Sequence, residues 1–160
     1  MAKRATWLAT VLIVGSIATA QPAWAAPCYE QSQLEAQMAA ATNQARRNAG
    51  LRALAVDPQL SQVAEVHSYW MERQNRLYHS NRLGWKVTNW VSLGENVGYG
   101  GSISTLQQMF MDSPGHRQNI LDPNFTYIGV SVRPEAGRLW VTVVFESRSN
   151  PGTRLDMRSC

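Results

Sequence analysis

The sequence predicts an α+β domain in which helices pack on an antiparallel sheet. Its first half carries helical patterns, with apolar residues at three-to-four spacing between capping and stop residues. Its last part carries two runs of alternating β-type residues joined by a short turn. After a secretion signal is set aside, the 160 residues leave a length suited to one domain with its own core.

The first 25 residues are typical of a secretory signal peptide. The stretch MAKRATWLATVLIVGSIATAQPAWAA has basic residues near its start, an apolar run from Trp7 to Ile17, and small residues at Ala23 and Ala25. That run is shorter than the roughly 20 residues that a membrane-spanning helix needs. We therefore expect a signal peptide at 1–25, a mature domain at 26–160 without a membrane span, and a secreted or periplasmic protein. A retained N-terminal anchor is the alternative.

The charge pattern does not favour nucleic-acid binding. The formal net charge of +4 falls to +2 when Lys3 and Arg4 leave with the signal peptide. The remaining basic residues are scattered along the chain, whereas binding to phosphates needs a concentrated basic face. They include Arg46, Arg47, Arg52, Arg73, Arg76 and Arg82.

Both cysteines lie near the ends of the mature chain, at Cys28 and Cys160. In an oxidising compartment such a pair most simply forms one disulfide that ties the ends together. Two terminal thiols, one of which bridges to another chain, are the alternative. We expect a monomer.

The helical half begins with an Ala-, Gln- and Glu-rich segment over 30–49, which Gly50 ends. A second helix is expected to open at Asp57, with Pro58 at its first position. His67 lies on the apolar stripe of that helix, and we interpret it as a buried structural histidine because no second ligand is near it in the sequence.

The segment 77–101 has no clear period and is rich in Gly, Asn, Trp and Ser, so we expect a long irregular segment, which in a compact domain is usually functional. It has no nucleotide-binding fingerprint. Ser102 or Ser104 can cap a third helix through Met111, and Pro114 ends or restarts it. Two strands at 126–133 and 138–147 then form a hairpin.

Three polar residues between positions 79 and 116 are candidate site residues: His79, Glu95 and His116. Their spacing matches no local metal motif, so only the fold could bring them together. Two neutral imidazoles can bind zinc or another divalent metal, and a carboxylate can orient a histidine or accept a proton from water.

Four motifs give the chain a recognisable pattern: YHSN, SLGENVGYG, MDSPGHRQNILDPNFTYIGVSV and LWVTVVF, in this order. Together they resemble the bacterial branch of the CAP superfamily, the group of cysteine-rich secretory proteins, antigen 5 and pathogenesis-related 1 proteins, also called SCP domains. The resemblance covers about 34–146. It implies an α-β-α sandwich with a central antiparallel sheet, secretion, and a cleft lined by two histidines and two acidic residues.

Two of those four cleft positions match this chain directly, as His79 of YHSN and Glu95 of GEN. The second acidic position falls near Asp112, which is at best a displaced substitute. The second histidine of the family aligns with the stretch NFTY at 124–127, where this chain has none. The bacterial pattern suggests that His116 supplies an imidazole instead, from the start of a helix.

His116 sits near the expected start of a helix, where the backbone dipole favours a neutral imidazole. The alternative is that His116 only packs within the capping turn. Ser113 is better explained as a helix cap than as a nucleophile activated by His116.

Three functions remain open. The first is a secreted, non-enzymatic protein that binds a lipid, glycan, peptide or divalent metal in a cleft of His79, Glu95 and His116. The second is a metal-dependent hydrolase, with metal on His79 and His116, Glu95 as the base, and a further donor such as Asp112. The third is a surface-interaction protein with a vestigial cleft, whose loops bind a partner such as the cell wall. The first is favoured, and the sequence leaves catalysis undecided.

Overall fold

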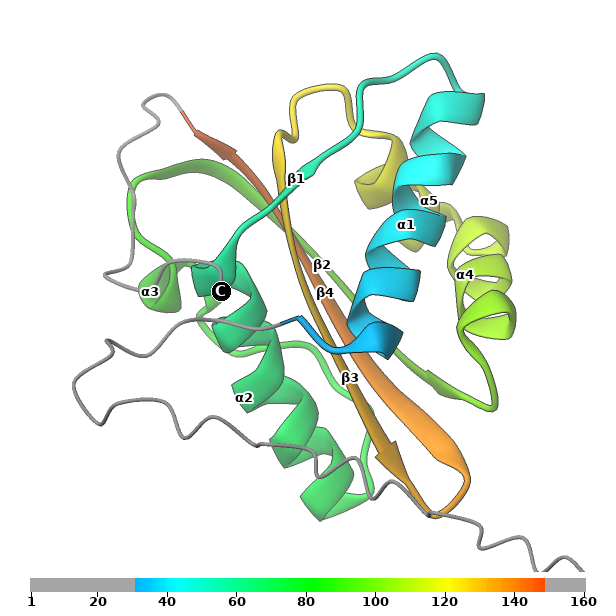
Figure 1. Cartoon of the computed structure of the whole chain (residues 1–160). Coiled ribbons are helices and arrows are strands. Elements are labelled where there is room, and N and C mark those ends of the chain that lie inside the picture. Colours follow the sequence, from blue (N-terminus) through cyan, green and yellow to red (C-terminus); the bar gives the residue numbers. More distant parts are fainter. Residues whose placement is uncertain (1–30, 149–160) are drawn as a thin grey trace, which may run out of the picture.

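The computed structural model describes residues 31–148, and the expected signal peptide, Cys28 and Cys160 lie outside that range. Within it, helices and strands form three layers (Figure 1). The helices are α1 (Gln33–Asn48), α2 (Pro58–Gln74), α3 (Leu83–Lys86), α4 (Ile103–Asp112) and α5 (Pro114–Leu121). The strands are β1 (Ala55–Val56), β2 (Trp90–Gly100), β3 (Tyr127–Glu135) and β4 (Arg138–Arg148).

The helix starts follow from short capping sequences. Ser32 accepts a hydrogen bond from the amide of Glu35, whose side chain bonds back to the amide of Ser32, so a capping box opens α1. Asp57 caps α2 with Pro58 at the first position, as predicted. Ser102 caps α4 through the amide of Thr105. The predicted helices over 30–49, from 58 and through 111 are thus confirmed within the described residues.

The four strands lie in the order β1-β3-β4-β2. Strand β4 pairs antiparallel with both β3 and β2, and β1 adds a short parallel edge to β3. The predicted hairpin is confirmed as β3 and β4, which turn through Ala136 and Gly137, both at positive φ.

The expectation that 77–101 is irregular throughout is wrong, because Trp90–Gly100 forms the eleven-residue strand β2. Glycine is unfavourable in strands, and it recurs here because helices α4 and α5 pack closely on β2. A Cβ at Gly94 would lie 2.8 Å from the side-chain oxygen of Asn119, and one at Gly98 would lie 3.0 Å from the ring of Phe110. These glycines therefore mark close packing on β2.

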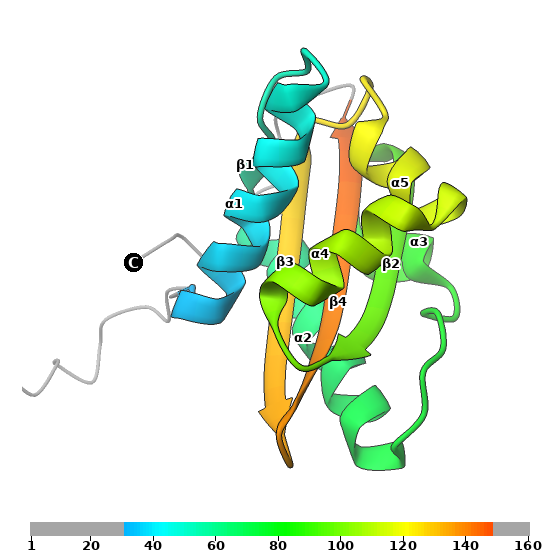
Figure 2. The ribbon, with the colours of Figure 1, turned by 90° about the vertical axis from the view of Figure 1, so that its right-hand side faces the viewer.

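One face of the sheet is covered by α1, α4 and α5, and the other by α2 (Figures 1 and 2). The first face holds the larger core, in which alternate residues of β3 and β4 pack against those three helices. On the second face, Leu60 and Ala64 of α2 pack on Val144 of β4. This is the expected α-β-α sandwich with a central, mainly antiparallel sheet.

Arg46 of α1 is fully buried and joins that helix to α5. Its guanidinium donates to the carbonyl oxygens of Ile120 and Asp122, each at 2.8 Å, and of Arg52 at 2.9 Å and Phe125 at 3.4 Å. Carbonyls at a helix C-terminus lack partners within the helix, so Arg46 supplies donors where α5 ends. It thereby holds in place the helix that carries His116.

Candidate functional site

Strand β2 places Glu95 in the sheet, opposite Val144 of β4, with its side chain only 6% exposed. One carboxylate oxygen, Oε1, lies 2.9 Å from Nδ1 of His79 and accepts a 2.8 Å hydrogen bond from the amide of Ser80. The other oxygen, Oε2, is buried with no protein hydrogen-bond partner. Glu95 thus orients the segment 79–80 and keeps one acceptor unused.

His79 presents its second ring nitrogen away from that pair. A carboxylate acceptor at Nδ1 favours the proton on that atom, which leaves Nε2 of the neutral ring as an acceptor. The His79 side chain is 60% exposed. It therefore offers Nε2 to solvent or to a ligand while Glu95 holds the ring in orientation.

The segment that carries His79 is anchored by the remaining histidine. His67 of α2 is 3% exposed, and its Nε2 lies 2.7 Å from the carbonyl oxygen of Tyr78, with the two rings in an edge contact. The structural interpretation of His67 is thus confirmed. Its hydrogen bond fixes the backbone one residue before His79.

Helix α5 brings His116 to the same place, at its third residue. The His116 ring lies 6.4 Å from that of His79 and 5.0 Å from that of Phe110, measured between ring centroids. Burial lowers the pKa of His116, and the nearby His79 lowers it further. The sequence predicts a neutral His116 from its place at a helix start. In the structure the main cause of the lowered pKa is burial.

Two asparagine side chains connect α5 to β2 through the backbone carbonyls of Glu95 and His116. The Asn119 amide donates to the carbonyl of Glu95 at 3.2 Å and to Oδ1 of Asn96 at 2.9 Å, and Asn96 donates to the carbonyl of His116 at 3.0 Å. Sequence reasoning missed both, although Asn96 belongs to GEN and Asn119 to the NIL of the longest motif. Asn96 follows Glu95 directly and Asn119 lies three residues after His116, and this nearness could have indicated that both support the site.

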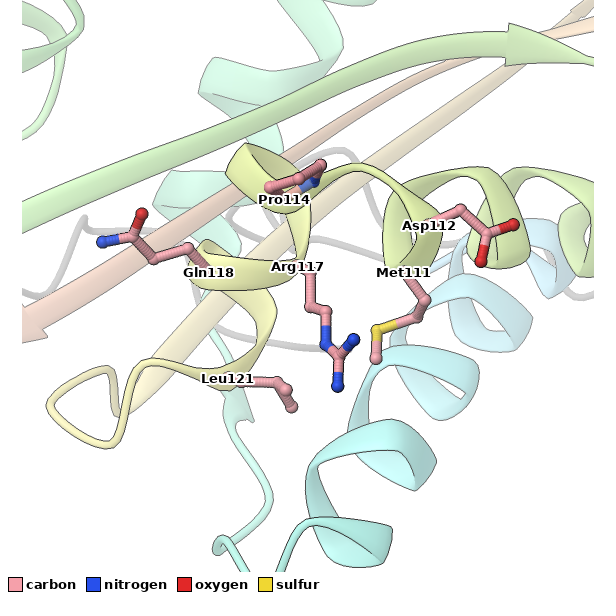
Figure 3. Close-up of a pocket in the computed structure, with 6 residues that line it drawn as sticks. All are labelled: Met111, Asp112, Pro114, Arg117, Gln118 and Leu121. Carbon is pink, nitrogen blue, oxygen red and sulfur yellow. The ribbon is translucent and has the colours of Figure 1, made fainter.

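Two residues proposed with this group are placed differently. Asp112 is exposed, accepts a hydrogen bond from Gln108, and lines a separate cavity of about 370 Å³ with Met111 and Arg117 (Figure 3). Ser113 stands at the N-cap position of α5, but its side chain makes no capping hydrogen bond. The predicted capping role of Ser113 is therefore wrong. Among residues 31–148, no hydrogen bond joins Ser113 to His116 either.

Beside His116 lies an apolar cavity of about 390 Å³ between β2 and α4. Three of its lining side chains are large, apolar and exposed: Leu77 at 43%, Tyr99 at 44% and Met109 at 51%. The other lining residues are Val97, Gly98, Leu106, Phe110, Ser113 and His116. The sequence did not indicate this cavity, because its residues come from three segments that are not adjacent in the chain.

The site therefore has a polar part, made of His79, Glu95 and His116, and an apolar part beyond His116. Within residues 31–148, no three histidine, cysteine, aspartate or glutamate side chains are placed to share one metal ion. In the same part of the chain, no helix is long and apolar enough to cross a membrane. The polar part can offer two imidazoles to a ligand or an ion, and residues 31–148 place no third histidine, cysteine, aspartate or glutamate to share an ion with them.

Comparisons with known proteins agree with this architecture. The model of the cysteine-rich secretory protein family, CAP, matches residues 39–145. The uncharacterized protein YkwD of Bacillus subtilis (strain 168) is 32% identical over 118 residues, which are 68% of this chain and 46% of that protein. The chain thus spans about half the length of this relative.

Solved structures give the same result. An extracellular protein of Bacillus anthracis str. Ames that contains an SCP domain is 28% identical, with a TM-score of 0.64 over 71% of this chain and 40% of that chain. NaASP2, solved with Zn²⁺, is 11% identical, with a TM-score of 0.59 over 81% of this chain and 88% of that chain, and at that identity the likeness concerns the fold alone. The chain belongs to the cysteine-rich secretory protein (CAP) family.

Proposed function

We propose that this protein is a secreted, non-enzymatic CAP-domain protein that binds a small amphipathic ligand in the cleft of His79, Glu95 and His116. The carrying observation is the hydrogen bond between His79 and Glu95, which orients one imidazole 6.4 Å from the neutral imidazole of His116. The extracellular neighbour from Bacillus anthracis supports secretion. The adjoining apolar cavity would receive the apolar part of the ligand.

A divalent metal such as Zn²⁺ is the simplest polar occupant of this cleft. Two imidazoles on one tetrahedral zinc place their ring centroids roughly 5 Å apart, so the 6.4 Å separation requires a shift of about an ångström. The carboxylate behind His79 is the outer-shell partner that metal-bound histidines usually have. NaASP2, which shares the fold, was solved with Zn²⁺, so the titration described below uses this ion. The residues present thus fit a weak two-histidine site completed by ligand or water.

A metal-dependent hydrolase is a weaker proposal for the same cleft. Catalytic zinc sites usually have three protein ligands, and the one further donor considered, Asp112, lines a different cavity from the one that His116 lines. Oε1 of Glu95 also accepts a hydrogen bond from the amide of Ser80 and lies 2.9 Å from Nδ1 of His79, so that oxygen is already engaged. The third candidate, a surface-interaction protein with a vestigial cleft, predicts no ligand or metal dependence on these residues.

The first test measures Zn²⁺ and Cu²⁺ affinity of the chain from residue 26 onward by isothermal titration calorimetry. We expect His79→Ala and His116→Ala each to lower affinity at least about 10-fold, because loss of an outer-shell partner alone typically costs about 10-fold to 100-fold. Asp112→Asn, the matched control, is expected to leave affinity unchanged. Unchanged binding in both histidine variants would refute a metal in this cleft. Loss of affinity in Asp112→Asn, together with turnover of peptide or ester substrates that Glu95→Gln abolishes, would instead establish the hydrolase.

The second test concerns the apolar cavity, with the dye 1-anilinonaphthalene-8-sulfonate as the probe. Met109→Glu puts a charge at the rim of the cavity and should weaken dye binding at least about 10-fold, because a carboxylate must stay hydrated. Val66→Glu is the control, since Val66 is 48% exposed on α2 and does not line the cavity. Equal dye binding by both variants would show that the dye does not occupy this cavity.

A further inference from the structure

A corner of the molecule that begins three residues after His79 in the sequence exposes apolar and basic side chains. We call it the Trp85 corner and define it by residues Arg82, Trp85, Lys86, Trp90 and Val91. Trp85 is 79% exposed, Trp90 43% and Val91 56%. Two exposed indoles and an exposed valine within seven residues of sequence give this corner more exposed apolar surface than singly scattered side chains would.

Local contacts keep this corner in shape. The indole nitrogen of Trp90 donates to the carbonyl of Gly84 at 3.0 Å. The guanidinium carbon of Arg82 lies 4.4 Å from the centroid of the Trp85 ring, in a cation–π contact. Helix α3 and the start of β2 are thus joined at Gly84, and the Trp85 ring stays exposed beside a cation.

The sequence segment that carries this corner has charges of one sign. Between Glu72 and Glu95 the sequence has no aspartate or glutamate, while it has Arg73, Arg76, Arg82 and Lys86. Neither basic residue of the corner forms an ion pair within residues 31–148. Arg82 and Lys86 are therefore available to an anionic partner.

We propose that the Trp85 corner docks the protein onto a membrane surface that contains anionic phospholipid. Indole rings are enriched at the level of lipid headgroups, and basic side chains beside them can reach the phosphates. The corner lines neither of the cavities described above, so it suits a broad, deformable partner better than a small molecule or a sugar held in a pocket. Charge complementarity favours an anionic surface over a zwitterionic one.

The expected affinity is modest and shared between the two kinds of contact. A basic residue close to an anionic surface contributes about fivefold to the partition coefficient, so Arg82 and Lys86 together contribute roughly 25-fold. A partly inserted indole contributes about fivefold to tenfold. Binding should weaken strongly in about 1 M salt, where the Debye length is about 3 Å.

The test is co-sedimentation of the chain from residue 26 onward, which contains every described residue, with vesicles. One set contains equal parts of phosphatidylglycerol and phosphatidylcholine, and the other phosphatidylcholine alone. We expect Trp85→Ala to lower partitioning into the anionic vesicles about fivefold to tenfold, and Arg82→Gln with Lys86→Gln to lower it roughly 25-fold.

Matched controls distinguish binding through the Trp85 corner from nonspecific binding to vesicles. Trp70→Ala removes an indole that is 50% exposed on α2, and Arg47→Gln removes an exposed cation on α1. Both should stay within twofold of the parent chain. Equal loss in Trp85→Ala and Trp70→Ala, equal binding to both vesicle sets, or no binding would overturn the proposal. Trp85-dependent binding to dextran sulfate without binding to anionic vesicles would overturn it too, and would assign the corner to an anionic polymer.

Discussion

Replacing Arg46 by methionine should destabilise the fold severely although the new residue is apolar. The variant removes short hydrogen bonds to the carbonyls of Ile120 and Asp122 and leaves the first of these buried without its donor. A hydrogen bond from a charged donor contributes roughly 1.5–3 kcal/mol. Methionine avoids the cost of desolvating the guanidinium, which offsets part of the free energy lost with these two hydrogen bonds. We expect a net loss of about 3 kcal/mol.

Urea unfolding followed by circular dichroism measures this loss. The m-value, the slope of the unfolding free energy against urea concentration, should be the same in both proteins. The melting temperature should fall by roughly 10 °C for a domain of this size. Arg47→Met is the control, because Arg47 is exposed and its side chain bonds to Gln44. We expect it to stay within about 0.5 kcal/mol of the parent. A loss below about 1 kcal/mol for Arg46→Met, or equal losses in both variants, would refute the assignment of Arg46 as the anchor of α5.

Two further predictions concern packing and protonation. Gly129→Ala should lower the free energy of unfolding by about 3 kcal/mol or more, because its Cβ would lie 2.1 Å from the carbonyl carbon of Leu60. Gly115→Ala is the control and should cost nothing, since its Cβ would have nothing within 4 Å. Equal losses in thermal unfolding would contradict the close approach of α2 to Gly129. The pKa of His116 in the folded protein is lowered from 6.5. On acidification the imidazole is therefore protonated in the unfolded chain before it is protonated in the folded one. The stability that depends on its neutral state is complete above about pH 6.5 and declines below it. His116→Gln should remove that decline, and an unchanged pH profile would contradict it.

The helices and the final hairpin could be predicted because their signals are local. Asp57-Pro58 begins α2 through contacts within three residues, and the alternating residues of β3 and β4 follow from the two-residue period of a strand. Strand β2 could not, because its glycines satisfy contacts with Asn119 and Phe110, which lie far along the chain. Propensity is a weak guide where such tertiary contacts decide the conformation.

The site could be predicted only in part for the same reason. The motifs indicated His79 and Glu95, and the structure pairs them at 2.9 Å. The role of Arg46 could not be found, since an arginine in a scattered basic set looks exposed until its carbonyl partners, up to 79 residues away, are known. Asp112 shows the opposite case, since nearness in sequence to His116 did not bring it to the site.

The two histidines of the proposed cleft are held by different parts of the fold. His116 belongs to a helix that Asn119 fastens to the sheet at Glu95 and Asn96, while His79 lies on the connection between α2 and α3. An occupant of the cleft would therefore order the connection more than the helix. In amide hydrogen exchange, ligand binding should slow exchange over 77–82 and leave 114–121 nearly unchanged. The proposed cleft thus has one side built on a helix and the other on a connection that side-chain hydrogen bonds hold at Tyr78, His79 and Ser80.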